Sequence, residues 1–289
     1  MGYIWNEITK WLKDLLVSGI MSNLTGLFSS VNSQVADIAD TVGMTPQGWN
    51  ASVFNMVRSL SDTVVVPIAG VILAIVMTME LIQMLIDRNN MHDFETFMFF
   101  KWIFKTAVAI LIVTNTWNIV MGVFEIAQNV VQNAAGVIIN DTAIDLNTFT
   151  ANMQTRLMAL DVGTLFGMWF QSMLIGIVSW VLTICIFVIV YGRMVEIYLV
   201  TSIAPIPMAT MSNHEWGQIG QNYLRSLFAL GFQAFLIIIC VGVYAVLVQS
   251  IAVTGDVIDS IWTCIGYTVL LCFTLFKTAS LSKSIFNAH

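Results

Sequence analysis

The residues of this sequence that could take part in chemistry are mainly charged side chains next to long apolar runs. Arg193 and Glu196 stand one helical turn apart, directly after a long run without a charge. At the centre of a membrane span, each charge costs about 2.5 to 3.5 kcal/mol. Opposite charges at positions i and i+3 near a membrane face offset most of that cost. We therefore predict that Arg193 and Glu196 form an ion pair beside the membrane.

The uncharged stretch that follows, residues 197–211, contains Pro205 and Pro207. It is shorter than the ~20 residues that a helix needs to cross a bilayer. Two prolines remove backbone donors and fix φ, so a regular helix through them is not expected. Irregular backbone at membrane depth is tolerated only where protein or a water-filled cavity surrounds it. The pattern predicts either a broken, re-entrant element at a membrane face or a kinked cytoplasmic connector that packs on neighbouring helices.

Further polar side chains interrupt other apolar runs, among them Glu80, Gln171 and Gln233. Glu80 lies near the end of its run, where an acid either reaches the interface or faces the interior of the bundle. Polar groups in spans usually form hydrogen bonds to another helix, each worth about 1 kcal/mol. The alternative is that these three residues line a hydrophilic path. Because the bundle of one chain is narrow, a wide path requires several copies.

Motifs of known enzyme and metal sites are absent from the sequence. There is no HExxH, GxSxG or phosphate-binding loop, and no CxxC pair. All cysteines lie in apolar runs, and the histidines are far apart: Cys185, Cys240, Cys264 and Cys272; His92, His214 and His289. We therefore predict no catalytic residue, no cofactor and no metal, and we do not expect an enzyme.

The composition is that of a membrane protein. Apolar residues make up 58% of the 289 residues and charged residues only 10%, against roughly 25% charged in soluble domains. The formal net charge is −6, and the 11 basic residues are scattered. Without a basic stripe, nucleic acid is expected as a transient partner at most. The predicted class is an all-α polytopic protein in contact with lipid.

Five apolar runs are long enough to cross a bilayer and position these polar residues. They correspond to residues 63–86, 102–124, 165–191, 226–253 and 257–276. We predict two regions, an N-terminal amphipathic and extramembrane helical region at 1–62 and a transmembrane helical domain at 63–289. Lys101 and Lys105 precede the second span and are expected to reach toward lipid headgroups.

The segments outside the spans are also assigned from pattern. Residues 1–28 alternate apolar and charged positions at helical spacing, which predicts an amphipathic helix that lies on the membrane or docks on a partner. Residues 29–61 are polar and small, with a turn signal at 45–48, and predict one or two short helices. Residues 125–164 form the longest and most acidic connection, with a short surface helix at 149–160.

The basic residues predict the orientation. With the N-terminus outside and the C-terminus in the cytoplasm, only Arg58 and Arg156 lie near span ends on the outer side. Basic residues concentrate on cytoplasmic segments, so this arrangement fits the sequence best. The residues that it places inside are Arg88, Lys101, Lys105, Arg193, Arg225, Lys277 and Lys283.

A family resemblance lies in the same central stretch. The sequence reads R-x-x-E-x-Y from Arg193, then A-P-I-P from Ala204, then N-x-E-x-x-x-I-G-x-N from Asn213 to Asn222. This arrangement resembles the TrbL-like family of conjugal transfer proteins, in the form found in integrative conjugative elements of Gram-positive bacteria. The resemblance covers about residues 60–280 in span layout, is sharp over 192–235 and is weak over 1–60.

The resemblance implies a membrane component of a type IV secretion system. Such proteins assemble in several copies to help form the DNA and protein translocation path, beside motor ATPases and other subunits. It implies no catalytic residues. The matched positions enter only as structural or coupling candidates, with Arg225 added because it precedes the fourth span: Arg193, Glu196, Pro205, Pro207, Glu215, Asn222 and Arg225.

Two rival hypotheses remain open at this point. One is a stand-alone ion or small-solute channel or transporter that uses Glu80, Arg193 and Glu196 as its path. Transporters commonly show paired broken helices in two related halves, whereas this sequence has one broken element. The other is a purely structural or immunity-type membrane protein without a conduit.

Overall fold

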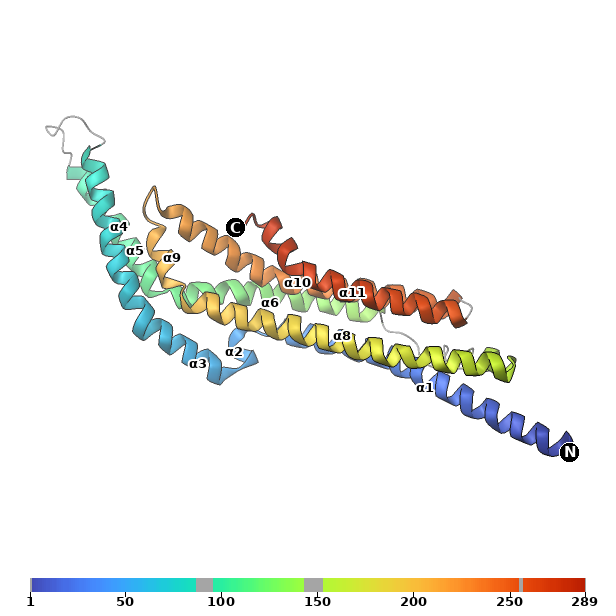
Figure 1. The fold of residues 1–289 in the computed structure, drawn as a ribbon. Helices are drawn as coiled ribbons and strands as arrows, with labels where there is room; N and C mark the ends of the chain where they lie inside the picture. The colour runs from blue at the N-terminus through green and yellow to red at the C-terminus, as the bar shows by residue number, and fades with distance from the viewer. Residues whose placement is uncertain (1, 87–95, 143–152, 255–256, 289) are drawn as a thin grey trace. The chain divides into compact units, whose positions relative to one another are not determined.

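The computed structural model describes residues 2–86, 96–142, 153–254 and 257–288 (Figure 1). Within these ranges every regular element is a helix, which confirms the predicted all-α class. The chain divides into two compact units. Unit 1 comprises Met1–Val42, Val131–Val190 and Leu236–Thr278, and unit 2 comprises Gly43–Val130, Tyr191–Phe235 and Ala279–His289. The predicted division at residue 62 stays a prediction.

Ten α-helices carry labels, and a short π-helical turn and a short helical segment at 153–158 accompany them. They are α1 (Gly2–Val42), α2 (Pro46–Trp49), α3 (Ala51–Leu60), the π-helical turn η1 (Ser61–Val65), α4 (Val66–Ile86), α5 (Thr96–Thr114), α6 (Thr116–Thr142), α8 (Val162–Ser202), α9 (Pro205–Thr210), α10 (Gly217–Thr254) and α11 (Val257–Ile285).

Five helical stretches are long and apolar enough to cross a membrane, as predicted. They are Ala51–Ile86, Phe97–Thr114, Val162–Ser202, Gly217–Ser250 and Trp262–Ile285. Helices α8 and α10 extend beyond the predicted apolar runs at both ends, because polar residues continue them. The chain is therefore a helical, multi-pass membrane protein.

The predicted end of the second span, at residue 124, is wrong. The helix is interrupted at Asn115, and the candidate crossing helix ends at Thr114. Three consecutive side chains donate to carbonyls of the preceding turn: Thr114 Oγ1 to Ile110, Asn115 Nδ2 to Leu111 and Thr116 Oγ1 to Ile112. Such back-bonding bends helices, which accounts for the interruption.

The predicted connection at 125–164 is also wrong in part. Helix α6 continues through this region to Thr142, and residues 153–158 are helical. The predicted surface helix at 149–160 therefore overlaps a real one, while its first residues, 149–152, lie outside the described part of the chain. No proline interrupts 125–142, so the polar residues there simply continue the helix.

The N-terminal region is more continuous than predicted. One helix, α1, extends from Gly2 to Val42 instead of ending near residue 28. The predicted turn at 45–48 contains the single-turn helix α2, whose N-cap Thr45 accepts a hydrogen bond from the Gly48 amide at 3.2 Å. Asn50 caps α3 in the same way, through Val53 N at 3.0 Å. Ser, Thr and Asn are preferred at such caps because their oxygens satisfy free amides.

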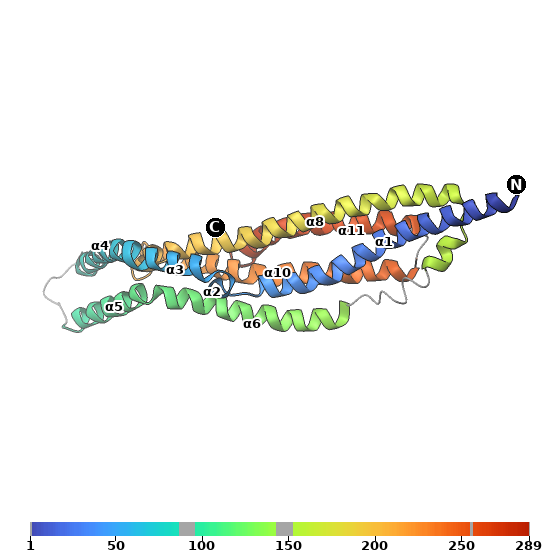
Figure 2. The same ribbon diagram turned by 90° about the horizontal axis from the view of Figure 1, so that it is seen from below.

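In unit 1, α1 packs along α8, and the two helices run in the same direction (Figures 1 and 2). Asn23 Nδ2 donates to Ser172 Oγ at 2.9 Å. A Cβ at Gly19 would lie 2.7 Å from Cδ1 of Trp169, so glycine is needed for this close approach. Helices α10 and α11 are joined by Tyr244 and Thr268, whose hydroxyl oxygens lie 2.8 Å apart.

Three buried apolar clusters lie among the described residues of unit 2. One joins α6, α8 and α10 through residues such as Phe124, Ile197 and Leu227. A second joins α4, α5 and α9, and a third joins α3, α6 and α8. Between α3 and α4, the wide turn η1 precedes Pro67, whose ring clashes with a regular helix at the carbonyl four residues earlier. The wide turn relieves that clash.

Candidate functional site at the proline break

The break between α8 and α10 is the first feature of the candidate site. Helix α8 ends at Ser202, and tight turns follow, with Ala204 N donating to Thr201 O at 3.2 Å and Ile206 N to Ile203 O at 3.1 Å. Pro205 begins α9, a position where its missing N–H costs nothing. The prediction that prolines break the helix within 197–211 is confirmed.

Helix α9 is buried almost completely. Its buried residues are Pro205, Pro207, Met208, Ala209 and Thr210. Ala209 packs in one cluster with apolar residues of α4 and α5, namely Ala69, Leu73, Met77, Ala109 and Val113. Protein thus surrounds the irregular backbone, as required of such a segment at membrane depth. Both predicted forms, the re-entrant element and the packed connector, share this burial, and the choice between them stays a prediction.

Asn213 organises the turn after α9. Its Oδ1 accepts hydrogen bonds from the amides of Glu215 at 2.8 Å and Trp216 at 3.0 Å. Its carbonyl accepts from Gly217 N at 2.9 Å, where α10 begins. Asn213 is 5% exposed. It therefore satisfies two amides of the turn before α10 and the first amide of that helix, much as an N-cap residue does.

Glu80 of α4 holds this turn from the other side. Its Oε2 accepts from Asn213 Nδ2 at 2.9 Å and from His214 N at 3.4 Å, and its Oε1 pairs with Lys105 Nζ of α5. Glu80 is 8% exposed, so of its two predicted positions it takes the interior one within this unit. The carboxylate links α4, α5 and the turn before α10 through a charge-assisted network.

Arg193 and Glu196 each reach a different helix. The guanidinium of Arg193, which is 5% exposed, donates from Nε to the Leu230 carbonyl of α10 at 3.1 Å. Glu196 Oε1 pairs with Lys283 Nζ of α11 at 3.0 Å. In the same region, Ser282 Oγ donates to Ala229 O. These contacts attach the end of α8 to α10 and α11 just before the break.

Two tyrosines complete the attachment of α8. Tyr198 OH donates to the Pro46 carbonyl at 2.6 Å, and its ring lies against Trp49. Tyr223 OH of α10 donates to the Val200 carbonyl at 3.1 Å. Because carbonyls near a helix end lack partners within the helix, the Tyr223 contact satisfies a group that the break leaves free.

Gly220 allows α10 to approach the break closely. A Cβ at this position would lie 2.6 Å from the Pro207 carbonyl oxygen and in collision with Met211 Cγ. Real Cβ atoms do not approach backbone oxygen so closely, so any side chain here forces α9 and α10 apart.

The remaining predicted residues lie outside this network. Glu215 and Arg225 are exposed, and the Asn222 carbonyl accepts from Ser226 Oγ at 3.0 Å. Gln171 belongs to unit 1 and Gln233 to unit 2. Both have a buried Oε1 without a hydrogen-bond partner in the described part of the chain. Among the described residues no group of acidic, His and Cys side chains is arranged to hold a metal.

Sequence reasoning missed several residues of the network: Lys105, Asn213, Gly220 and Lys283. The opposite charges of Glu80 and Lys105, on either side of a short connection, were a signal for a hairpin pair. Asn213 and Gly220 stand within the quoted N-x-E-x-x-x-I-G-x-N motif, so their chemistry was available. The role of Lys283 could not be predicted in this way, because Lys283 lies 87 residues from its partner Glu196.

A known protein family matches more than half of the chain. A family model described as "TrbL/VirB6 plasmid conjugal transfer like protein" matches residues 31–205. The matched stretch includes Arg193, Glu196 and Pro205, ends before Pro207 and begins earlier in the chain than the resemblance at the central motif suggests. No curated protein and no solved structure matches the chain.

Proposed function

Because the chain belongs to the family of TrbL/VirB6 plasmid conjugal transfer-like proteins, we propose that it is a multi-copy channel component of a conjugative type IV secretion system. Family membership makes it a component of conjugal transfer, and the apolar helices make it a multi-pass membrane protein. In the proposal, several copies assemble and help form the path for DNA and protein. The chain itself carries no catalysis.

The observation that supports this proposal most is the proline break held by charged side chains, of which Glu80 and Arg193 are buried. Glu80, Lys105 and Asn213 fix one side of the break, and Arg193 and the Glu196–Lys283 pair fix the other. Ionisable groups are expensive in membrane proteins and mark functional regions by default. Because several helices hold the break in place, a movement at one membrane face can pass through the break to the other helices of the channel.

The orientation of the chain and its partners belong to the same proposal. The distribution of basic residues supports an outer N-terminus and a cytoplasmic C-terminus, with the break at the cytoplasmic face. His214, Glu215, Trp216 and Arg225 are exposed there. They offer a surface to other secretion subunits, including the motor ATPases, while nucleic acid contacts the chain only transiently.

The stand-alone channel or transporter is the rival function. It uses Glu80 in its path, whereas the Glu80 carboxylate is occupied by Lys105 and Asn213. This supports a structural role for Glu80. Solute flux through liposomes containing the purified protein, lost on Glu80→Gln, is the result that favours the rival.

Deletion of the gene from a mobilising element tests the proposal. We expect transconjugants to disappear and the wild-type gene supplied in trans to restore them. Transfer that continues undiminished contradicts the proposed function. The copy number is measured separately, as the mass of the detergent-extracted particle, and a single protomer contradicts multi-copy assembly.

A further inference from the structure

Two apolar grooves lie side by side on unit 1. The first, of about 390 Å³, lies between α6 and α10, and the second, of about 150 Å³, lies between α10 and α11. Ile239, Val243 and Leu247 of α10 line both grooves and form a ridge between them. We call the two grooves together the double groove. Its other lining residues are Val137, Ile138, Gly242 and Val246 in the first groove, and Cys240, Tyr244, Tyr267, Leu270, Leu271 and Thr274 in the second.

The lining of the double groove suits hydrocarbon. All seven residues of the first groove are aliphatic or glycine. In the second groove, the Thr274 hydroxyl donates to the Leu271 carbonyl at 2.9 Å, and the Tyr244 hydroxyl lies 2.8 Å from Thr268 Oγ1. Because these hydroxyls have partners within the protein, they do not require a polar ligand. Helices α10 and α11 are also apolar enough to cross a membrane.

The size of the grooves favours extended chains over a second helix. A helix with its side chains is about 10–12 Å across, so a piece about 12 Å long occupies roughly 900 Å³ or more. Neither groove reaches half of that volume. An extended hydrocarbon chain is much thinner than a helix. Since the α10 ridge divides the surface into two narrow grooves, a ligand with two such chains fits it best.

A lysine follows the lining residues of the second groove. Lys277 lies seven residues after Leu270 and three after Thr274, so the three side chains share one face of α11. Lys277 is exposed. Residues 262–276 carry no charge, and the next two charged residues of α11, Lys277 and Lys283, are both positive. A negatively charged headgroup is therefore attracted to this end of the groove.

The length of the second groove corresponds to the depth of one leaflet. From Tyr267 to Lys277, α11 rises about 15 Å, at 1.5 Å per residue. The hydrocarbon core of a bilayer is about 30 Å thick, so one leaflet contributes about 15 Å. In the proposed orientation, Lys277 lies at the cytoplasmic end of the crossing part of α11. An acyl chain whose headgroup lies at Lys277 can therefore follow the groove along its whole length.

We propose that the double groove and Lys277 form a binding site for an anionic phospholipid of the inner leaflet. One acyl chain lies in each groove, on either side of the α10 ridge, and the phosphate group lies beside the Lys277 ammonium. The inference goes beyond the proposed function and takes from it only the orientation of the chain. Basic side chains at the cytoplasmic side of crossing helices bind such headgroups in membrane proteins generally.

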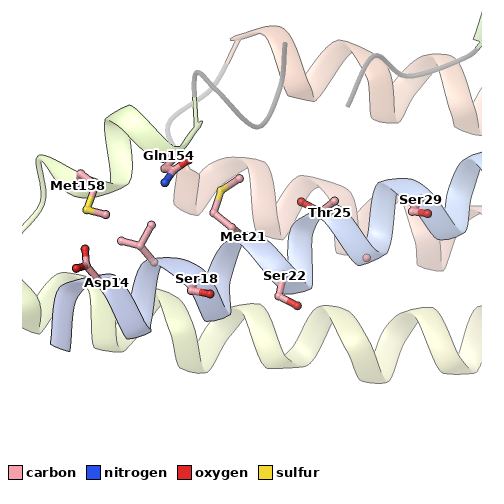
Figure 3. Close-up of a pocket in the computed structure, with 10 residues that line it drawn as sticks. Asp14, Ser18, Met21, Ser22, Thr25, Ser29, Gln154 and Met158 are labelled. Carbon is pink, nitrogen blue, oxygen red and sulfur yellow. The ribbon is translucent and has the colours of Figure 1, made fainter. Parts of the chain in front are cut away.

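Another hollow of unit 1 has the opposite chemistry (Figure 3). It lies between α1 and residues 154–158 and has a volume of about 760 Å³. Carboxylate, hydroxyl and amide groups line it, from Asp14, Ser18, Ser22, Thr25, Ser29 and Gln154. Because uncovered polar groups are costly in hydrocarbon, no acyl chain is expected there. Peptides from residues 14–29 therefore serve as the negative reference in the experiment.

Photoreactive phospholipids test the site. The full chain is reconstituted in phosphatidylcholine liposomes with a small fraction of phosphatidylglycerol or phosphatidylcholine that carries a diazirine in one acyl chain, and labelled peptides are identified by mass spectrometry. We expect phosphatidylglycerol to label residues 239–247 and 267–274 about fivefold more than phosphatidylcholine does, the factor that one lysine contributes at an anionic surface. Lys277→Gln should remove this preference. Lys101→Gln, at an exposed lysine of another crossing helix, should retain it.

A second variant fills the grooves without changing charge. Val243→Phe enlarges a side chain of the ridge that is 55% exposed, so the protein core is not disturbed. Its control is Val181→Phe on α8, where the valine is 44% exposed and lines neither groove. We expect Val243→Phe to lower labelling by phosphatidylglycerol to the level of phosphatidylcholine, and Val181→Phe to leave it unchanged.

The remaining outcomes contradict the proposal. Equal labelling by the two lipids means that the grooves hold bulk lipid without selection of the headgroup. A preference that survives Lys277→Gln places the headgroup elsewhere. Labelling of residues 239–247 that is no stronger than that of residues 14–29 means that protein, such as a second copy of the chain, covers the double groove.

The comparison of the two lipids on the unchanged chain does not depend on the folding of any variant. None of these measurements uses conjugal transfer. Failure of the lipid site and failure of the proposed function are therefore distinguishable.

Discussion

Removing Lys105 is predicted to damage the protein more than removing its partner Glu80. The two side chains differ in burial: counting side-chain atoms alone, 36% of Lys105 and 11% of Glu80 is exposed. Lys105→Met leaves a buried carboxylate with only Asn213 Nδ2 and the His214 amide as donors. Glu80→Gln leaves an ammonium group that still reaches water. Lys105→Met is therefore the more damaging change, because the charge that it leaves unpaired, the Glu80 carboxylate, is the one with less access to water.

The magnitudes follow from the same burial. Breaking a buried ion pair costs about 3–5 kcal/mol when the remaining charge is fully buried. Since Lys105 is partly exposed, we expect about 2–3 kcal/mol for Lys105→Met and about 1 kcal/mol for Glu80→Gln. The double variant Glu80→Gln/Lys105→Met removes both charges. It should cost less than the sum of the two single variants, by about 1 kcal/mol or more.

The assay is the free energy of unfolding in mixed detergent micelles. Lys101→Met is the matched control, because Lys101 is exposed and lies one helical turn before Lys105 on α5. We expect the control to stay within about 0.5 kcal/mol of the wild type. If Lys105→Met and Lys101→Met unfold alike, or if Glu80→Gln is the more damaging change, the reasoning from burial is refuted.

Three further predictions concern single contacts. Gly220→Ala should cost about 1–3 kcal/mol of unfolding free energy, because its Cβ would lie 2.6 Å from the Pro207 carbonyl oxygen. The control is Gly192→Ala, which should not destabilise the protein because nothing lies within 4 Å of the added Cβ. Equal costs for the two variants would contradict the close approach of α10 to the break. Tyr198→Phe should cost about 1 kcal/mol and speed hydrogen exchange at Trp49 and Asn50, because the Pro46 carbonyl loses its donor; unchanged exchange would count against this anchor. Hydrogen bonds from the hydroxyl and the amide of Thr164 lower the pKa of Asp161 below its ordinary value of 3.8. The cap at the start of α8 is therefore fully present above that value and is lost as the pH falls through the lower folded pKa; a carboxyl NMR titration of Asp161 checks this, and a midpoint at or above the ordinary value would refute it.

The crossing helices were predictable because their apolar runs are long and rarely interrupted. Residues 226–253 have no charge, and α10 contains all of them. The ends were not predictable, since α8 continues through Arg193 and Glu196 to Ser202, about three turns beyond the predicted end at residue 191. The interruption at Asn115 was missed because hydroxyl and amide side chains are tolerated in apolar runs, and only their bonding to the preceding turn bends the helix.

The partners of the charged residues were beyond local pattern. Spacing placed Arg193 beside Glu196, and the structure adds bonds from Arg193 to Leu230 and from Lys283 to Glu196, which spacing does not predict. Glu80 meets Asn213 across 133 residues, a separation that no helical period encodes. The break itself was predictable from the sequence, because two prolines in the uncharged run 197–211 disfavour a continuous helix through it.

The central claim is that the braced proline break is required for conjugal transfer, and transfer frequency with Lys105→Met measures it most directly. With membrane levels matched, the account predicts that this variant lowers transconjugant numbers by about tenfold or more, the factor that corresponds to 1.4 kcal/mol. Lys101→Met should transfer like the wild type. Wild-type transfer by a Lys105→Met protein whose unfolding free energy has fallen as predicted contradicts the account.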